Sequence, residues 1–172
     1  MATTHFAAIL TSPLQRAVMT AQTLLDAQPA PQPSLTASDL LREQHFGIAE
    51  GKPWTMKAVP HLSFADHVAK GIYISTYSRS EKFPGGESPD DLSRRAEKAV
   101  EELLLPYIWD TERDRSKNTH IAIVSHGLCI GAIMVALVKM DASGTRPSGD
   151  YYGLLNTAWA RVSVEVNVSP QL

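Results

Sequence analysis

The sequence predicts one α/β domain of three layers, a mostly parallel sheet with helices on both faces. Two short apolar runs, residues 6–10 and 120–125, have the composition of buried strands. Each leads within a few residues into a segment with apolar side chains at helical spacing. Strands that alternate with helices in this way favour a parallel sheet.

The first strand, residues 6–10, ends at Thr11-Ser12-Pro13. Ser12 is expected to cap the next helix and Pro13 to lie in its first turn. The apolar pattern continues this helix to about residue 27, and the Pro-rich stretch 29–34 ends it. Residues 35–51 have a mixed pattern, residues 54–70 predict one or two short helices, and residues 71–86 predict a long loop.

A clear helix begins after Ser88, the expected cap, with Pro89 at its first position and Asp91 at capping-box spacing. The strand at 120–125 leads through His126-Gly127 into an apolar helix that ends near residue 138. Alternating valines over 158–168 predict a final strand. The domain is expected to span residues 1–172, with a cap-like insertion at about 52–86.

The composition limits the partners. The 172 residues are 44% hydrophobic and 20% charged, with a net charge of −2, so no broad field attracts nucleic acid or an anionic membrane. Any anion site must be local. The single cysteine, Cys129, excludes an intramolecular disulfide. No signal peptide or membrane span is expected, which favours the cytoplasm. The six histidines are scattered, and we expect no metal or other cofactor.

Side chains that could bind an anion follow two of the predicted strands. Arg16 lies in the first turn of a helix that follows a strand, where backbone N–H groups and a guanidinium can grip an anion. Ser125-His126-Gly127 follows the second strand, and parallel strands would bring His126 to the same crevice. Gly127 would let the backbone approach a ligand. A solvated Arg16 and a structural His126 are the alternatives.

Two glutamates lie beside glycines in loop-like sequence, Glu43 in LREQHFGIAEG and Glu87 in PGGES. A carboxyl group beside a phosphate would have its pKa raised and could act as a general acid. The alternative for each is an exposed loop charge.

Four segments in this order, TSPLQRAVMTAQTL, LREQHFGIAEG, PGGES and VSHG, resemble successive motifs of the histidine phosphatase (phosphoglycerate mutase-like) superfamily. The resemblance covers residues 6–168 and implies phosphoryl transfer to a histidine, as in phosphoric monoester hydrolases and mutases. It implies that Arg16 clamps phosphate, that His126 contacts the phosphoryl group and that Glu43 donates a proton. It places Glu87 nearby, with Ser12, Ser88 and Gly127 as further phosphate-binding positions.

The family's Arg-His-Gly motif, which carries the phosphate-accepting histidine, has no counterpart here. His5 lies before the first predicted strand, at the wrong end for the crevice. We therefore expect an N-terminally truncated member that lacks the family's first strand, and whose usual phosphohistidine route is closed in the chain alone. The gap in the sheet predicts a homodimer or a strand exchange.

Three functions remain open from the sequence. The first is a phosphatase-type enzyme that is weakened or depends on a partner. The second is a non-catalytic module that binds a phosphorylated small molecule or a protein. The third is a repurposed acid–base enzyme, a dehydratase, isomerase or cyclase, in which His126 and Glu43 act on a small organic substrate.

Overall fold

The computed structural model describes residues 4–55, 57–75, 77–113, 119–142 and 158–165. It has the predicted α/β architecture. The chain divides into two compact units. The first contains Met1–Glu43 and Arg95–Leu172, and the second contains Gln44–Arg94.

The first unit is built on a parallel sheet of three strands, in the order β2-β1-β5. The strands are β1 (Ala8–Thr11), β2 (Ser34–Ala37) and β5 (Ile121–Val124). The register aligns Thr11 at the end of β1 with Val124 at the end of β5. The carboxyl ends of these two strands therefore meet at one edge of the sheet, as the sequence predicted for the segments that carry Arg16 and His126.

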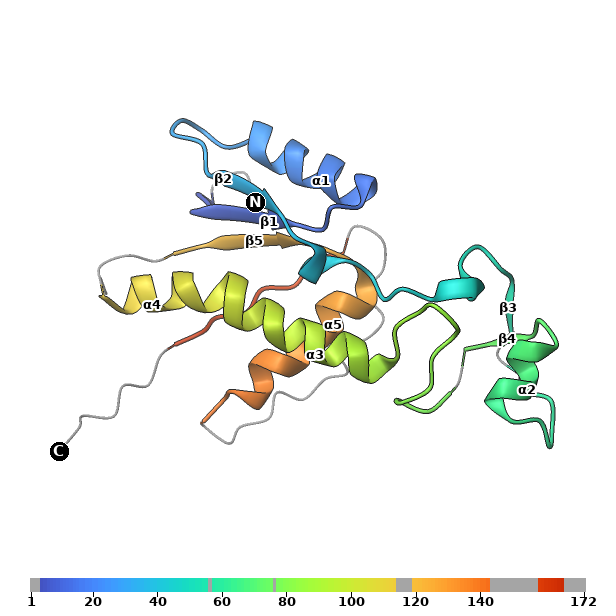
Figure 1. The fold of residues 1–172 in the computed structure, drawn as a ribbon. Helices are drawn as coiled ribbons and strands as arrows, with labels where there is room; N and C mark the ends of the chain where they lie inside the picture. The colour runs from blue at the N-terminus through green and yellow to red at the C-terminus, as the bar shows by residue number, and fades with distance from the viewer. Residues whose placement is uncertain (1–3, 56, 76, 114–118, 143–157, 166–172) are drawn as a thin grey trace. The chain divides into compact units, whose positions relative to one another are not determined.

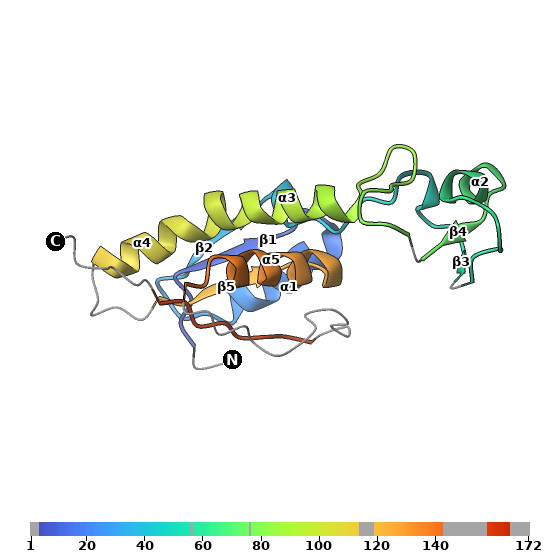
Figure 2. The same ribbon diagram turned by 90° about the horizontal axis from the view of Figure 1, so that it is seen from below.

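Helices cover both faces of this sheet. The helix α1 (Gln15–Asp26) packs across all three strands. Figure 1 shows α1 on one side of the strands, with α4 (Leu105–Arg113) and α5 (Gly127–Lys139) on the other. In the view from below, α5 lies in front of α1 (Figure 2). One π-helical turn, η3 (Val100–Leu104), precedes α4.

The second unit has an aromatic core of its own. The Phe83 side chain is 1% exposed, and four aromatic rings surround it at centroid distances between 5.0 and 5.7 Å, those of Trp54, Phe64, Tyr73 and Tyr77. The elements around it are η2 (Gly47–Ala49), the paired strands β3 (Trp54–Thr55) and β4 (Tyr73–Ile74), and α2 (Phe64–Ala69). The helix α3 (Pro89–Ala99) begins in this unit and ends in the first.

Two sequence predictions about the sheet were wrong. No strand was expected at β2, whose residues are mostly exposed and so lack the apolar run of a buried strand. The predicted final strand is not formed over residues 158–165, which are exposed and lack regular secondary structure. Alternating valines favour a strand only where a neighbouring strand accepts their backbone hydrogen bonds. Residues 166–168 of that prediction lie outside the described residues. The segment 141–150, rich in Gly, Ser and Pro, is predicted from the sequence to be a loop, and its residues 143–150 also lie outside them.

Among the helices that the structure describes, none has both the length and the apolar composition needed to cross a membrane.

Candidate functional site

The junction between β1 and α1 is built around Ser12, which is fully buried. Its backbone N–H donates to the Val124 carbonyl at 2.9 Å, which extends the β1–β5 ladder by one residue. Its Oγ accepts a hydrogen bond from the Leu14 N–H at 3.3 Å. The helix α1 begins at Gln15, and its N-cap residue Leu14 makes no side-chain cap bond. The prediction that Ser12 caps α1, with Pro13 in its first turn, was wrong.

The Ser12 hydroxyl binds a histidine instead. His126 is the N-cap residue of α5, in an extended conformation, and is 8% exposed. Its Nε2 lies 2.8 Å from Ser12 Oγ, and Arg16 Nε donates to its Nδ1 at 3.2 Å. Because Nδ1 accepts from a guanidinium, the proton of the neutral ring is on Nε2, which donates to Ser12. Gly127 is the first residue of α5, directly after this histidine.

The surroundings favour the neutral form of His126. Burial lowers the pKa of the imidazole, and the adjacent Arg16 cation lowers it further. The Glu43 carboxylate acts in the opposite direction, while Arg42 and Arg95 make smaller contributions that also lower the pKa. The site is therefore an exposed arginine held against a buried, neutral imidazole.

Glu43 is half-buried and approaches the same helix from η1 (Asp39–Leu41). Its Oε2 accepts from the Leu128 N–H at 3.2 Å and its Oε1 accepts from the Cys129 N–H at 3.1 Å. These N–H groups belong to the first turn of α5, where no helical carbonyl can accept from them. The structure thus brings Ser12, Arg16, His126, Gly127 and Glu43 together within the first unit.

One polar side chain in this region was absent from the sequence analysis. Arg95 in α3 donates to the carbonyls of Leu40 at 3.0 Å, Arg42 at 2.8 Å and Glu43 at 3.3 Å. An arginine seven residues into a helix resembles any solvated helix residue. The sequence shows two adjacent arginines, Arg94 and Arg95, in the helix after PGGES, and it does not indicate which of them binds backbone carbonyls.

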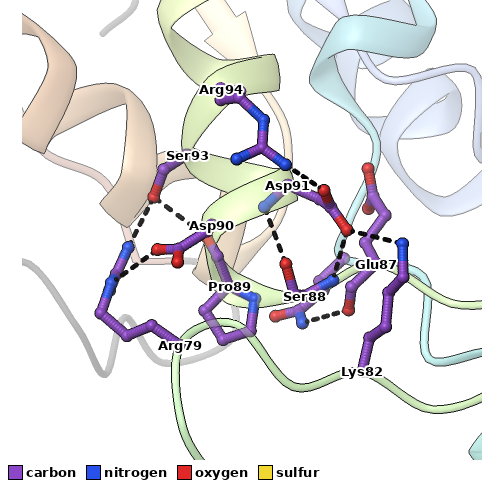
Figure 3. Close-up of polar contacts among 10 residues, drawn as sticks. Arg79, Lys82, Glu87, Ser88, Pro89, Asp90, Asp91, Ser93 and Arg94 are labelled. Carbon is purple, nitrogen blue, oxygen red and sulfur yellow. Dashed lines mark hydrogen bonds and ion pairs between the residues drawn. The ribbon is translucent and has the colours of Figure 1, made fainter.

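The other two predicted positions, Glu87 and Ser88, belong to the second unit. Ser88 Oγ accepts from the Asp91 N–H at 3.0 Å, and Asp91 Oδ2 accepts from the Ser88 N–H at 3.0 Å. This confirms the predicted capping box at the start of α3 (Figure 3). Glu87 Oε2 accepts from the His45 N–H at 3.0 Å.

Charge reinforces this cap. Lys82 Nζ lies 3.1 Å from Asp91 Oδ2, and Arg94 also pairs with the Asp91 carboxylate. The hydrogen bond from Ser88 N–H, followed by that from Lys82, holds the pKa of Asp91 well below its ordinary value. In the part of the chain that the structure describes, Ser88 therefore acts as a helix cap, and its phosphate-binding role stays a prediction.

Two predicted glycine-rich segments cross within the second unit. Gly47 has φ +55°, and a Cβ there would lie 2.1 Å from the Pro84 carbonyl oxygen. A Cβ on Gly86 would lie 2.7 Å from the His45 carbonyl oxygen. Gly47 of LREQHFGIAEG and Gly86 of PGGES are therefore required by a close crossing of the two backbones.

No group of three or more His, Cys, Asp or Glu side chains that could hold a metal ion occurs among the described residues. The model of the histidine phosphatase superfamily (branch 1) matches residues 1–166.

The chain belongs to the histidine phosphatase superfamily.

Solved structures of the family share the fold. A structure of mycobacterial hydrolase 1 is 25% identical, with a TM-score of 0.55, and the match covers 78% of this chain and 60% of that one. A complex of mycobacterial glucosyl-3-phosphoglycerate phosphatase with VO3 is 25% identical, with a TM-score of 0.54 and coverage of 78% and 59%. The complex of that phosphatase with inorganic phosphate is 24% identical, with a TM-score of 0.55 and coverage of 80% and 61%.

This chain thus spans about three-fifths of the length of those solved chains. No curated protein sequence matches it.

Proposed function

We propose that this chain binds the phosphoryl group of a small phosphate monoester at Arg16 and His126. We also propose that the 172 residues alone do not turn it over through a phosphohistidine. The observation that carries the proposal is the 3.2 Å hydrogen bond from Arg16 Nε to His126 Nδ1. It joins a cation and a neutral imidazole at the carboxyl ends of two adjacent parallel strands, where α/β sheets bind ligands.

The pair suits an oxyanion. A guanidinium presents a planar fork of donors that matches phosphate oxygens. A phosphate beside His126 would raise the imidazole pKa and favour a second proton on the ring, so the buried neutral ring can become a charged donor when the anion arrives. The family membership of the chain and the VO3 bound to the 25%-identical phosphatase support this reading.

The route to turnover needs a nucleophile. The 172 residues contain no Arg-His-Gly triplet. His5 lies three residues before β1, at the opposite end of the strand from Ser12. We therefore propose a phosphate-binding module as the activity of this polypeptide by itself, in the cytoplasm. The proton-donor role of Glu43 stays a prediction.

Calorimetric titration with inorganic phosphate and orthovanadate tests the binding site. Arg16→Met and His126→Ala should each weaken binding about 10- to 100-fold, because each removes a contact worth about 1.5–3 kcal/mol. His5→Ala is the matched control and should bind like the parent chain. Equal affinity in all four proteins, or no binding by the parent chain, would refute the site.

Release of phosphate from p-nitrophenyl phosphate and sugar phosphates tests the second half of the proposal. The parent chain should show no release above background. Release that disappears in His126→Ala would instead show an active phosphatase.

We further propose that the β5 edge pairs with a second copy of the chain, as a homodimer or a strand exchange. Among the described strands β5 pairs only with β1, and its sequence, IAIV, is wholly apolar yet only half-buried. Strands of a parallel sheet are ordinarily buried on both faces. An open edge strand also presents unpaired N–H and C=O groups, with which another chain can pair. Light scattering after size exclusion should give twice the chain mass of 18.8 kDa, and a stable monomer would refute the dimer.

A further inference from the structure

The α5 helix holds His126 at its amino end, so the position of that end decides where the imidazole lies. Helix amino ends carry N–H groups without helical acceptors and a partial positive charge. In this protein two of those groups, from Leu128 and Cys129, already have an acceptor, because the Glu43 carboxylate binds both with its two oxygens. Such charge-assisted bonds are stronger than neutral ones.

Glu43 comes from a distant segment, so that segment must be held against α5 for the cap to form. Two contacts come from the β5–α5 junction itself. Ser125 Oγ donates to the Leu41 carbonyl at 2.7 Å, and Cys129 Sγ lies 3.8 Å from the Leu40 carbonyl. These bonds fasten residues 40–41 beside the end of β5.

Three further hydrogen bonds to this segment come from one guanidinium. Arg95 Nη1 donates to the carbonyls of Leu40 and Arg42, and Nη2 donates to that of Glu43. A planar fork is suited to several acceptors at once, whereas a lysine ammonium on a flexible stem is not. Arg95 is half-buried, whereas its neighbour Arg94 is exposed and pairs with Asp91. The two adjacent arginines of α3 therefore differ in environment.

We propose that Arg95 is a positioning residue for the anion site. By binding the carbonyls of residues 40, 42 and 43, it holds the Glu43 carboxylate on the Leu128 and Cys129 N–H groups and so fixes the end of α5 that carries His126. This inference rests on the proposed phosphate binding at Arg16 and His126. Arg95 acts in this proposal through its hydrogen bonds to residues 40, 42 and 43.

Amide hydrogen exchange in the full 172-residue chain tests the mechanical step without any ligand. The Leu128 and Cys129 amides should be protected in the parent chain, because their acceptor is Glu43. Arg95→Lys and Arg95→Met should each accelerate their exchange at least tenfold. Arg94→Met is the matched control and should leave both rates unchanged. Unchanged rates at Leu128 and Cys129 in a folded Arg95 variant would overturn the proposal.

Phosphate affinity tests the functional step. Arg95→Lys keeps the charge and most of the side chain, so it is the variant expected to stay folded. It should weaken inorganic phosphate binding about tenfold, and unchanged affinity with accelerated exchange would overturn the positioning role. A parent chain that does not bind phosphate would refute the proposed function, while the exchange rates would still decide whether Arg95 positions Glu43.

Discussion

The chain contains the same dipeptide, Ser-Pro, in front of two helices, and the two serines do different things. Ser12-Pro13 precedes α1 and Ser88-Pro89 precedes α3. Both serines are buried, with exposed fractions of 0% and 3%. Ser88 caps its helix. The Ser12 hydroxyl instead accepts a hydrogen bond from His126, and α1 begins at Gln15.

The difference lies in what each hydroxyl meets. Asp91, three residues after Ser88, returns its carboxylate to the Ser88 N–H and completes a reciprocal cap. The residue three after Ser12 is Gln15, and the Ser12 N–H donates to the Val124 carbonyl of the sheet. With its N–H in the β-ladder, Ser12 cannot enter a capping box, and its oxygen is available to a side chain across the sheet edge.

The largest effect that separates the two serines is expected on ligand binding. Ser12→Ala removes the acceptor of the His126 Nε2–H, and an unpaired buried donor costs about 1–3 kcal/mol. The imidazole should then lose its fixed orientation. Calorimetry should show inorganic phosphate affinity reduced about tenfold, with the far-ultraviolet dichroism of the helices retained. A Ser12→Ala protein that binds phosphate like the parent would show that the Ser12–His126 bond is incidental.

Ser88→Ala should change stability and leave binding intact. Loss of an N-cap serine costs about 1 kcal/mol of the free energy of unfolding, and denaturant titration measures it. Phosphate affinity should equal that of the parent, because the Ser88 hydroxyl accepts from the Asp91 N–H and is not among the described hydrogen-bond partners of Arg16 and His126. If Ser88→Ala weakens phosphate binding as Ser12→Ala does, then Ser88 is a phosphate ligand, as the sequence analysis first suggested.

The sequence predicted the parts of the fold that depend on local pattern. The predictions of β1, of β5 and of the Ser88 capping box were correct. Each of these features depends on residues that are neighbours in the sequence. It also placed Arg16 and His126 after the ends of two strands, β1 and β5, which are adjacent and parallel in the sheet.

The features that were missed depend on contacts between distant residues. The mostly exposed residues of β2 form a strand because β1 lies beside them. Residues 158–165 have the sequence pattern of a strand but no strand structure. The contact between Arg95 and the Leu40 carbonyl spans 55 residues. The acceptor is a backbone carbonyl, which every residue has, so the identity of residue 40 does not indicate this contact.

The smallest expected effect is on the pH dependence of stability. It differs between His126, which binds the Ser12 hydroxyl, and Asp91, which binds Ser88. Both His126 and Asp91 have a pKa below its ordinary value, the first through burial and Arg16, the second through the Ser88 N–H and Lys82. A group with a lowered folded-state pKa stabilises the protein above its unfolded pKa and loses that contribution as pH falls through the folded value. For His126 this loss therefore begins below about pH 6.5, the ordinary value, and for Asp91 only below 3.8.

Nuclear magnetic resonance of the His126 ring measures this difference directly. The midpoint should lie below 6.5. Arg16→Met should raise it, because a nearby cation is removed, whereas Glu43→Gln should lower it further, because the carboxylate that favours the charged ring is removed. Ser88→Ala should leave the His126 midpoint unchanged. A midpoint that does not respond to Arg16→Met would mean that the arginine and the imidazole are not held together in solution, and the contrast between the two serines would lose its basis.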